Sequence, residues 1–130
     1  MNVTTLKLNL VVAWIWVLLG FLSGFVLGTR FHEEKWLGGY ASHKRRLYRL
    51  GHISFFGLAL INLMYYFTAR GLPASTGMAV ASWGFIAGAI AMPICCVIMV
   101  HRPRLRALFL VPVISLVAAG IATILEVIKS

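Results

Sequence analysis

Acidic side chains are scarce in this chain, which has no aspartate and only three glutamates against twelve lysines and arginines. The missing aspartate excludes a Ser-His-Asp triad, and no glycine-rich phosphate loop follows a predicted strand. Glu33 and Glu34 lie in a hydrophilic connection, and Glu126 lies near the C-terminus. A proton-coupled carrier usually needs an ionisable group deep in the membrane, so transport is not favoured either. We do not expect the chain to be an independent enzyme.

Cysteine is equally rare, and the two that occur, Cys95 and Cys96, are adjacent. Neighbouring cysteines rarely pair, and there is no third thiol for either to meet, so we expect no disulfide within the chain. Met92 and Met99 share a helical face with them, and soft sulfur ligands suit Cu(I). Packing is the favoured interpretation, because no second sulfur cluster faces this one from another apolar segment.

Hydrophobic residues are abundant. They make up 61% of the 130 residues, and the mean hydropathy is +0.92, whereas soluble domains contain roughly 45–50% apolar residues. Four segments approach or exceed the about 20 apolar residues that a bilayer requires, and the first is longer than a signal-peptide core. We predict an all-α integral membrane protein with a single membrane domain over residues 1–130. Its fold is an antiparallel up-down bundle of four transmembrane helices, at about 8–29, 50–68, 77–100 and 108–128.

The net charge of +9 is distributed unevenly along the chain. Nine of the twelve cations lie between the first and second or the third and fourth predicted spans, and the others are Lys7, Arg70 and Lys129. The positive-inside rule then predicts cytoplasmic loops at 30–49 and 101–107 and both termini outside, in an inner membrane that we expect to be bacterial. The basic loops should attract anionic lipid by about 1 kcal/mol per cation. Nucleic-acid binding is not expected, because no soluble domain displays these cations.

Small residues recur every four positions in two spans, at Gly20, Gly24 and Gly28 and at Gly84 and Gly88. Such faces let helices approach closely, and we expect them to contact a helix of the same chain, another membrane subunit or a second copy.

Two polar or irregular features also lie inside the spans. Asn62 is the deepest polar side chain, and we expect it to hydrogen-bond a neighbouring helix. Pro93 and Pro112 each remove a backbone donor, so the third and fourth helices should bend or loosen there.

Histidines are the most informative polar residues, because His32, His52 and His101 all fall at the predicted cytoplasmic boundary. One interpretation is a b-type haem with His52 and His101 as axial ligands. Cationic partners for its propionates would then come from nearby arginines, namely Arg45, Arg49 and Arg102. A second is a metal site formed by His32, His52 and His101, with Glu33 or Glu34 as a further ligand. The third and favoured one is interfacial histidine without a cofactor, beside other amphipathic side chains.

Together these features predict a small subunit or accessory protein of a larger membrane complex, without catalysis of its own. A redox complex is one form this could take. The alternative is a b-type haem protein that transfers electrons through His52 and His101. A small transporter or channel is the third hypothesis.

Overall fold

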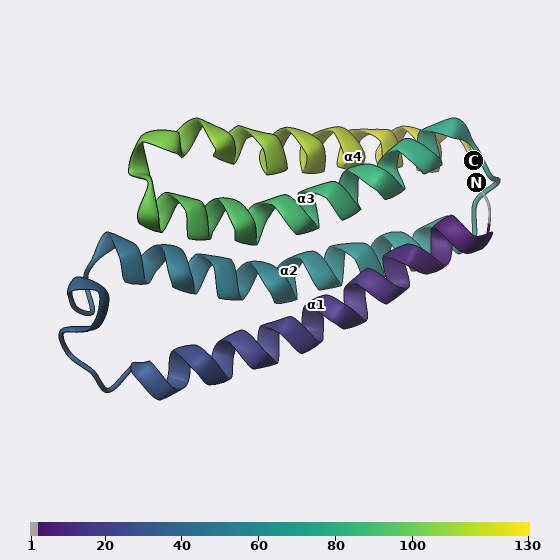
Figure 1. The fold of residues 1–130 in the computed structure, drawn as a ribbon. Helices are drawn as coiled ribbons and strands as arrows, with labels where there is room; N and C mark the ends of the chain where they lie inside the picture. The colour runs from purple at the N-terminus through teal and green to yellow at the C-terminus, as the bar shows by residue number, and fades with distance from the viewer. Residues whose placement is uncertain (1–2) are drawn as a thin grey trace.

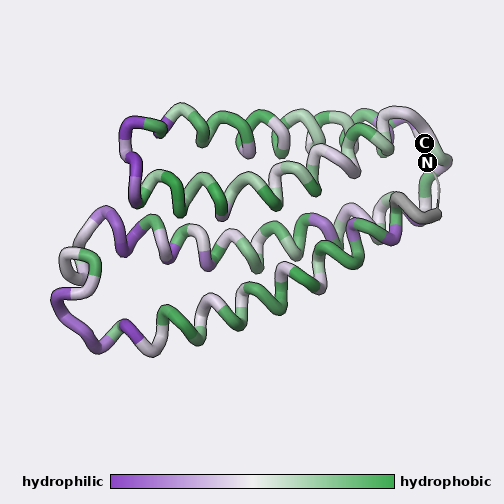
Figure 2. The backbone as a smooth tube through the Cα atoms, viewed as in Figure 1, coloured by the Kyte–Doolittle hydropathy of each residue, from purple (hydrophilic) through white to green (hydrophobic). Residues whose placement is uncertain are grey.

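The computed structural model describes residues 3–130, which form four long helices and two short 3-10 helices (Figure 1). Each long helix is long and apolar enough to cross a membrane, so the predicted set of four apolar helices is confirmed. Figure 2 shows that hydrophobic residues dominate these helices, whereas hydrophilic residues concentrate at one end of the bundle. In chain order the elements are α1 (Val3–Arg30), η1 (Trp36–Gly38), α2 (His43–Arg70), α3 (Thr76–His101), η2 (Pro103–Phe109) and α4 (Leu110–Lys129).

The four helices lie side by side in the order α1, α2, α3, α4 (Figure 1). Helix α2 packs against both α1 and α3, and α4 packs against α3. Both chain ends lie at one end of the bundle, together with the α2–α3 turn, while η1 and η2 lie at the other. Helix α1 packs closely with α2 near the chain ends and diverges from it toward η1. This divergence shapes the candidate site described below.

Helix α2 begins at His43, seven residues before the predicted start at 50. Ser42 caps it, because its side chain accepts a hydrogen bond from the Arg45 backbone N–H at 3.2 Å, which satisfies one of the free donors of the first turn. The apolar pattern starts later than the helix, so hydropathy alone placed the boundary too far along the chain. A basic helical turn therefore precedes the apolar part of α2.

A buried polar cluster joins three helices in the half of the bundle that carries the α2–α3 turn. Asn9 on α1, Asn62 on α2 and Ser82 on α3 are all completely buried. The Asn9 side-chain amide donates to the Asn62 side-chain oxygen at 2.9 Å, and the Ser82 hydroxyl donates to the Asn9 side-chain oxygen. Asn62 also donates to the Leu58 carbonyl at 2.9 Å. The prediction that Asn62 bonds a neighbouring helix is confirmed.

The glycine faces are used within the chain. A Cβ atom on Gly20 or Gly24 would lie 2.6 or 2.8 Å from the nearest side-chain atom of α2, so these glycines permit close contact between α1 and α2. Gly84 and Gly88 likewise face α4, where an added Cβ atom would lie 2.8 and 2.5 Å from the nearest side-chain atom. Gly28 has no such neighbour within 4 Å. Any contact with another subunit at the other four glycines would have to share space that the chain's own helices already fill.

Pro93 leaves one backbone carbonyl of α3 without its usual partner, because proline has no N–H to donate to the carbonyl of residue Ala89. The Trp16 side chain of α1 supplies the missing donor, with its Nε1 atom 3.0 Å from the Ala89 oxygen. Ala89 is fully buried, so water cannot take this role. The proline thus creates an acceptor that helps to hold α1 to α3.

Candidate functional site

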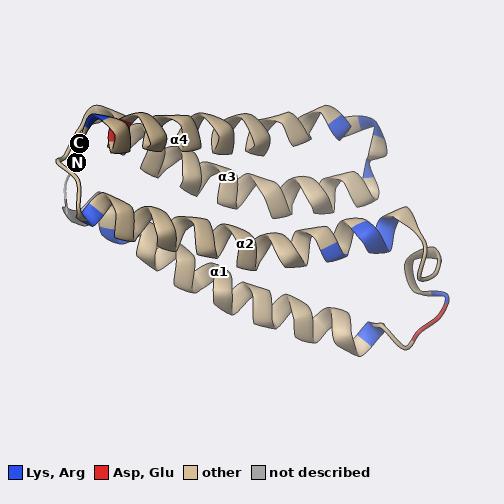
Figure 3. Cartoon of the chain, turned by 180° about the vertical axis from the view of Figure 1, so that it is seen from behind, with Lys and Arg blue, Asp and Glu red and all other residues tan. Residues whose placement is uncertain are grey.

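Positive charge gathers at the end of the bundle that carries η1 and η2 (Figure 3). Nine of the twelve lysines and arginines lie there, in the segments 30–49 and 102–106. The only ion pair of this end among the described residues joins Arg30 to Glu33 at 3.1 Å, and both side chains are about half exposed. Most of the cations are therefore free to meet anionic groups outside the chain.

The connection between α1 and α2 is organised around Arg45, whose side chain is only 2% exposed. Its Nε atom donates to the Trp36 carbonyl at 2.6 Å, and its Nη2 atom donates to the carbonyls of Glu33 and Glu34. The guanidinium also lies over the rings of Trp36 and Tyr40, at 5.3 and 4.5 Å from their centroids. Arg45 therefore anchors this connection, and these donors are not directed at a haem propionate.

The same connection turns back on itself at two glycines. Gly38 and Gly39 have φ angles of 87° and 96°, a region that side chains other than glycine rarely adopt. This turn brings Trp36 over the start of α2, where its ring lies 6.2 Å from that of Tyr48. Both aromatic residues line the cavity below.

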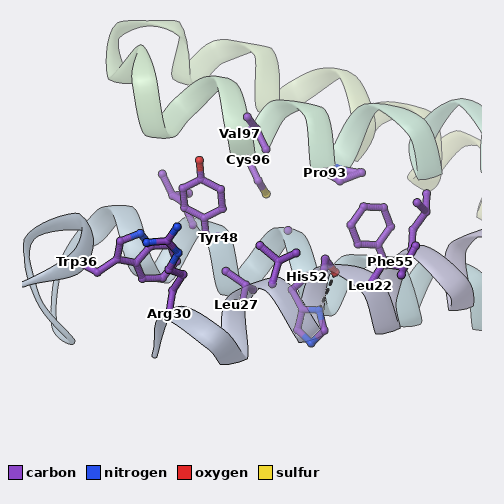
Figure 4. A pocket seen from close by; sticks show the side chains of 15 residues that line it. Leu22, Leu27, Arg30, Trp36, Tyr48, His52, Phe55, Pro93, Cys96 and Val97 are labelled. Carbon is purple, nitrogen blue, oxygen red and sulfur yellow. Dashed lines mark hydrogen bonds between the residues drawn. The ribbon is translucent and has the colours of Figure 1, made fainter. Parts of the chain in front are cut away.

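A cavity of about 660 Å³ lies between α1, α2 and α3, toward the basic end (Figure 4). Its lining is mainly apolar, and its polar or charged members are few: Ser23 and Arg30 from α1 and Tyr48 and His52 from α2. Ligand cavities in proteins commonly enclose about 300–1,000 Å³ and combine apolar walls with a few polar groups. The size and lining of this cavity therefore suit a small molecule with a limited polar part.

A second cavity of about 430 Å³ continues from the first. The two share four lining residues, namely Leu19, Phe55, Pro93 and Val97. The further lining of the second cavity, Trp16, Ile90, Ile94 and Ile98, is apolar apart from the indole nitrogen that bonds Ala89. The two cavities are therefore neighbours, and the polar side chains line the first.

His52 is fixed in this cavity by a hydrogen bond to α1. Its Nδ1 atom lies 2.9 Å from the Ser23 hydroxyl, which also donates to the Gly20 carbonyl at 3.0 Å. A serine hydroxyl has one proton, so if that proton serves Gly20, the His52 Nδ1 must carry a proton of its own. Nε2 of the neutral ring is then an acceptor. The ring lies on Gly24, where a Cβ atom would be 2.8 Å from its Cε1.

His101 lies at the end of α3, is exposed and does not line the cavity. Its Nε2 atom lies 3.4 Å from the Tyr48 hydroxyl. Tyr48 thus stands between the two histidines that were predicted to bind a haem. The structure places His52 in the lining of the cavity and His101 beside Tyr48, so the two imidazoles do not line the same cavity.

The remaining predicted site residues lie apart from the cavity. His32, Arg49 and Arg102 are exposed and do not contribute to its lining. Among residues 3–130, no three or more His, Cys, Asp or Glu side chains are grouped so that they could hold a metal ion. The structure therefore does not bring His32, His52 and His101 together with Glu33 or Glu34.

The two thiols are buried and unpaired. Cys95 donates to the Leu108 carbonyl at 3.4 Å, a carbonyl that Pro112, four residues later, cannot bond. Cys96 lines the cavity wall on α3. Cys95, like Trp16, thus donates to a backbone carbonyl that a proline leaves without its helical partner.

Ser23, Arg30 and Tyr48 line the cavity, and none of them was predicted as a site residue. Two signals were present. Tyr48 is four residues before His52, so the two share a helical face. Ser23 is a polar residue beside the glycine face of α1. Neither signal shows by itself that a cavity lies between the helices.

No family model matches the chain, and no curated protein or solved structure matches it.

Proposed function

We propose that the chain is a small integral-membrane subunit of a larger membrane complex, and that it contributes a binding surface and a cavity instead of catalysis. Four helices of membrane-spanning length support the membrane assignment. Outside these helices the described chain consists of short connections only. Such a chain has few residues outside the membrane that could contact soluble molecules, so its contacts are with lipid and with other membrane-embedded chains.

In this proposal the helices cross the membrane in alternating directions, with both termini outside and the loops 30–49 and 101–107 in the cytoplasm. The support is the gathering of nine cations at one end of the bundle (Figure 3), which is the distribution that the positive-inside rule associates with the cytoplasmic side. The membrane is the bacterial inner membrane. Anionic lipid contacts the exposed arginines and lysines of that face.

The partner contact is the exposed row on α1, which consists of Trp14, Leu18, Phe21 and Phe25. These residues are spaced by four, three and four positions, the spacing of a helix-packing seam. Phe25 is 73% exposed, the highest value in the row. This row is the observation that carries the subunit proposal, because all the glycines first considered for partners except Gly28 face helices of the same chain.

The experiment is site-specific photocrosslinking in native membranes. A photoreactive residue at Phe21 should give one discrete adduct with another membrane protein. The matched control is Leu60 on α2, which is similarly exposed, at 57% against 66%, and should give lipid adducts only. Identical patterns from the two positions, or no protein adduct at Phe21, would contradict the proposed contact.

The two other hypotheses rank below this one. A bis-histidine haem requires two axial nitrogens on a common cavity, whereas His101 lies outside the cavity that His52 lines. A proton-coupled transporter would be expected to place an acidic group on its pathway, and the cavity lining contains no glutamate.

A further inference from the structure

The polar pair of the cavity, His52 and Ser23, lies well inside the basic end of the bundle. Ser23 precedes Arg30 by seven residues on α1, which corresponds to about 10 Å along the helix axis. An anionic lipid phosphate would remain near Arg30, because bringing a charged group that far into hydrocarbon is costly. A neutral head group with hydrogen-bonding oxygens avoids this cost. The polar pair therefore fits an uncharged head group better than a phosphate.

The tautomer of His52 decides which head group fits. When the Ser23 hydroxyl donates to the Gly20 carbonyl, Nδ1 of the neutral ring donates to Ser23 and Nε2 is an acceptor. An acceptor at Nε2 calls for a ligand that donates, such as a hydroxyl. A carbonyl oxygen in the same place would leave two acceptors facing each other without a proton between them.

A second polar group lies one helical turn away. Tyr48 and His52 both line the cavity from α2, and in Figure 4 Tyr48 is directed toward α3 while His52 is directed toward α1. Both side chains thus line the cavity while extending toward different helices. The rings of Trp36 and Phe55 add aromatic walls, which suit a flat ring.

We propose that this cavity binds the head group of a lipid-soluble quinol, with one hydroxyl donating to Nε2 of His52 and the other oxygen facing Tyr48. The apolar tail occupies the second cavity, whose lining beyond the shared residues is hydrophobic. The proposal deepens the proposed function and rests on its membrane assignment, since a quinol site is a contribution that a non-catalytic subunit can make to a redox complex. Binding itself requires no partner subunit.

Tryptophan fluorescence of the purified chain, reconstituted in zwitterionic vesicles, tests the proposal. Trp36 lines the first cavity and Trp16 the second, whereas Trp14 and Trp83 are exposed. A background with Trp14→Phe and Trp83→Phe therefore reports on the two cavities. The probe is a decyl-tailed benzoquinol kept reduced, and the matching quinone is titrated in parallel.

The expected result is a saturable change in emission with the quinol, and affinity about tenfold weaker for the quinone, as the loss of one buried hydrogen bond predicts. His52→Leu and Ser23→Ala should each weaken quinol binding by about tenfold or more. Arg49→Gln is the control, because Arg49 is exposed and does not line the cavity. Each variant is first shown to be folded by its circular dichroism and melting temperature.

Three results would overturn the proposal. The first is no saturable response to the quinol. The second is a response that both His52→Leu and Ser23→Ala leave unchanged. The third is that anionic lipid displaces the quinol from the unaltered chain but not from the Arg30→Gln variant. The last result would identify the occupant as an anionic lipid. Because this assay uses the isolated chain, its failure is separate from failure of crosslinking at Phe21, which tests the partner contact.

Discussion

The bond between Trp16 and the proline-exposed carbonyl of α3 gives a stability prediction that can be worked out from the structure. Trp16→Phe keeps an aromatic ring beside Phe55, whose centroid lies 6.1 Å from that of Trp16, but removes the N–H that reaches the Ala89 oxygen at 3.0 Å. The carbonyl is then left unpaired, because Pro93 has no N–H to offer. The perturbation is therefore a lost hydrogen bond with little change in ring packing.

The expected cost follows from the burial of this carbonyl. Hydrogen bonds between membrane helices average about 0.6 kcal/mol and reach about 1.7 kcal/mol, and an unpaired buried acceptor costs about 1–3 kcal/mol. Since Ala89 is fully buried, we expect Trp16→Phe to lower the free energy of unfolding by about 1–2 kcal/mol. In a Pro93→Ala background the helix regains an N–H donor for Ala89, so the same change should cost about 0.5 kcal/mol.

The assay is reversible unfolding of the protein in mixed micelles, measured for both single variants and the double variant. The double-mutant cycle should give a coupling energy of about 1 kcal/mol between positions 16 and 93. Trp83→Phe is the control, because Trp83 is exposed on α3, and it should change stability by less than about 0.5 kcal/mol. A coupling energy below about 0.3 kcal/mol would refute the reasoning, since the proline would then not create the acceptor.

Three further predictions concern packing, the polar cluster and orientation. Gly24→Ala should displace the imidazole that rests on it and lower the free energy of unfolding by about 1–3 kcal/mol, whereas Gly28→Ala, at an open position, should be nearly neutral in the same micelle assay. Asn62→Leu should lower that free energy by about 1–3 kcal/mol through the unpaired polar groups it leaves, and an unchanged melting temperature would contradict this. In a cysteine-free background, Ala74→Cys should react with an impermeant thiol reagent added to intact cells and Ala41→Cys should not; the reverse would invert the proposed topology. Both positions are exposed and avoid the helix caps.

The long helices could be predicted from the sequence because each contains a continuous apolar run of sufficient length, a signal that does not depend on tertiary contacts. Asn62 could also be predicted, since a polar amide deep in a membrane helix needs a partner. Its partner on another helix, Asn9, could not be identified, because it lies 53 residues away in the chain, and neither could Ser82, which bonds Asn9 in turn. Their pairing depends on how α1 and α3 rotate against α2.

The candidate site could be predicted only in part. His52, one of the two predicted haem ligands, lines the cavity. Arg45 was predicted to be a cationic partner of a haem propionate because it lies near His52 in the sequence. In the structure it bonds the connection that folds back over the first turn of α2. Contacts made by an irregular loop have no periodic signal in the sequence, so Arg45's role could not be predicted.

The cavity itself was beyond sequence reasoning. It exists because α1 packs closely on α2 at one end and diverges at the other (Figure 1). Asn9 and Ala13 of α1 are buried nearer the chain ends, whereas Gly20 and Gly24 contact Phe56 and His52 beside the cavity. Hydropathy reports burial along a helix and does not report the angle between two helices, so it cannot predict the volume between them.

The size of the assembly in native membranes tests the central claim most directly. The tagged chain, solubilised in mild detergent, should migrate in native electrophoresis as part of an assembly larger than the purified chain, with a second protein in fixed proportion. Replacing both Phe21 and Phe25 by alanine should shift it to the size of the purified chain, whereas Leu60→Ala should not. Migration of the unaltered chain from native membranes at the size of the purified chain would contradict the proposed role as a subunit.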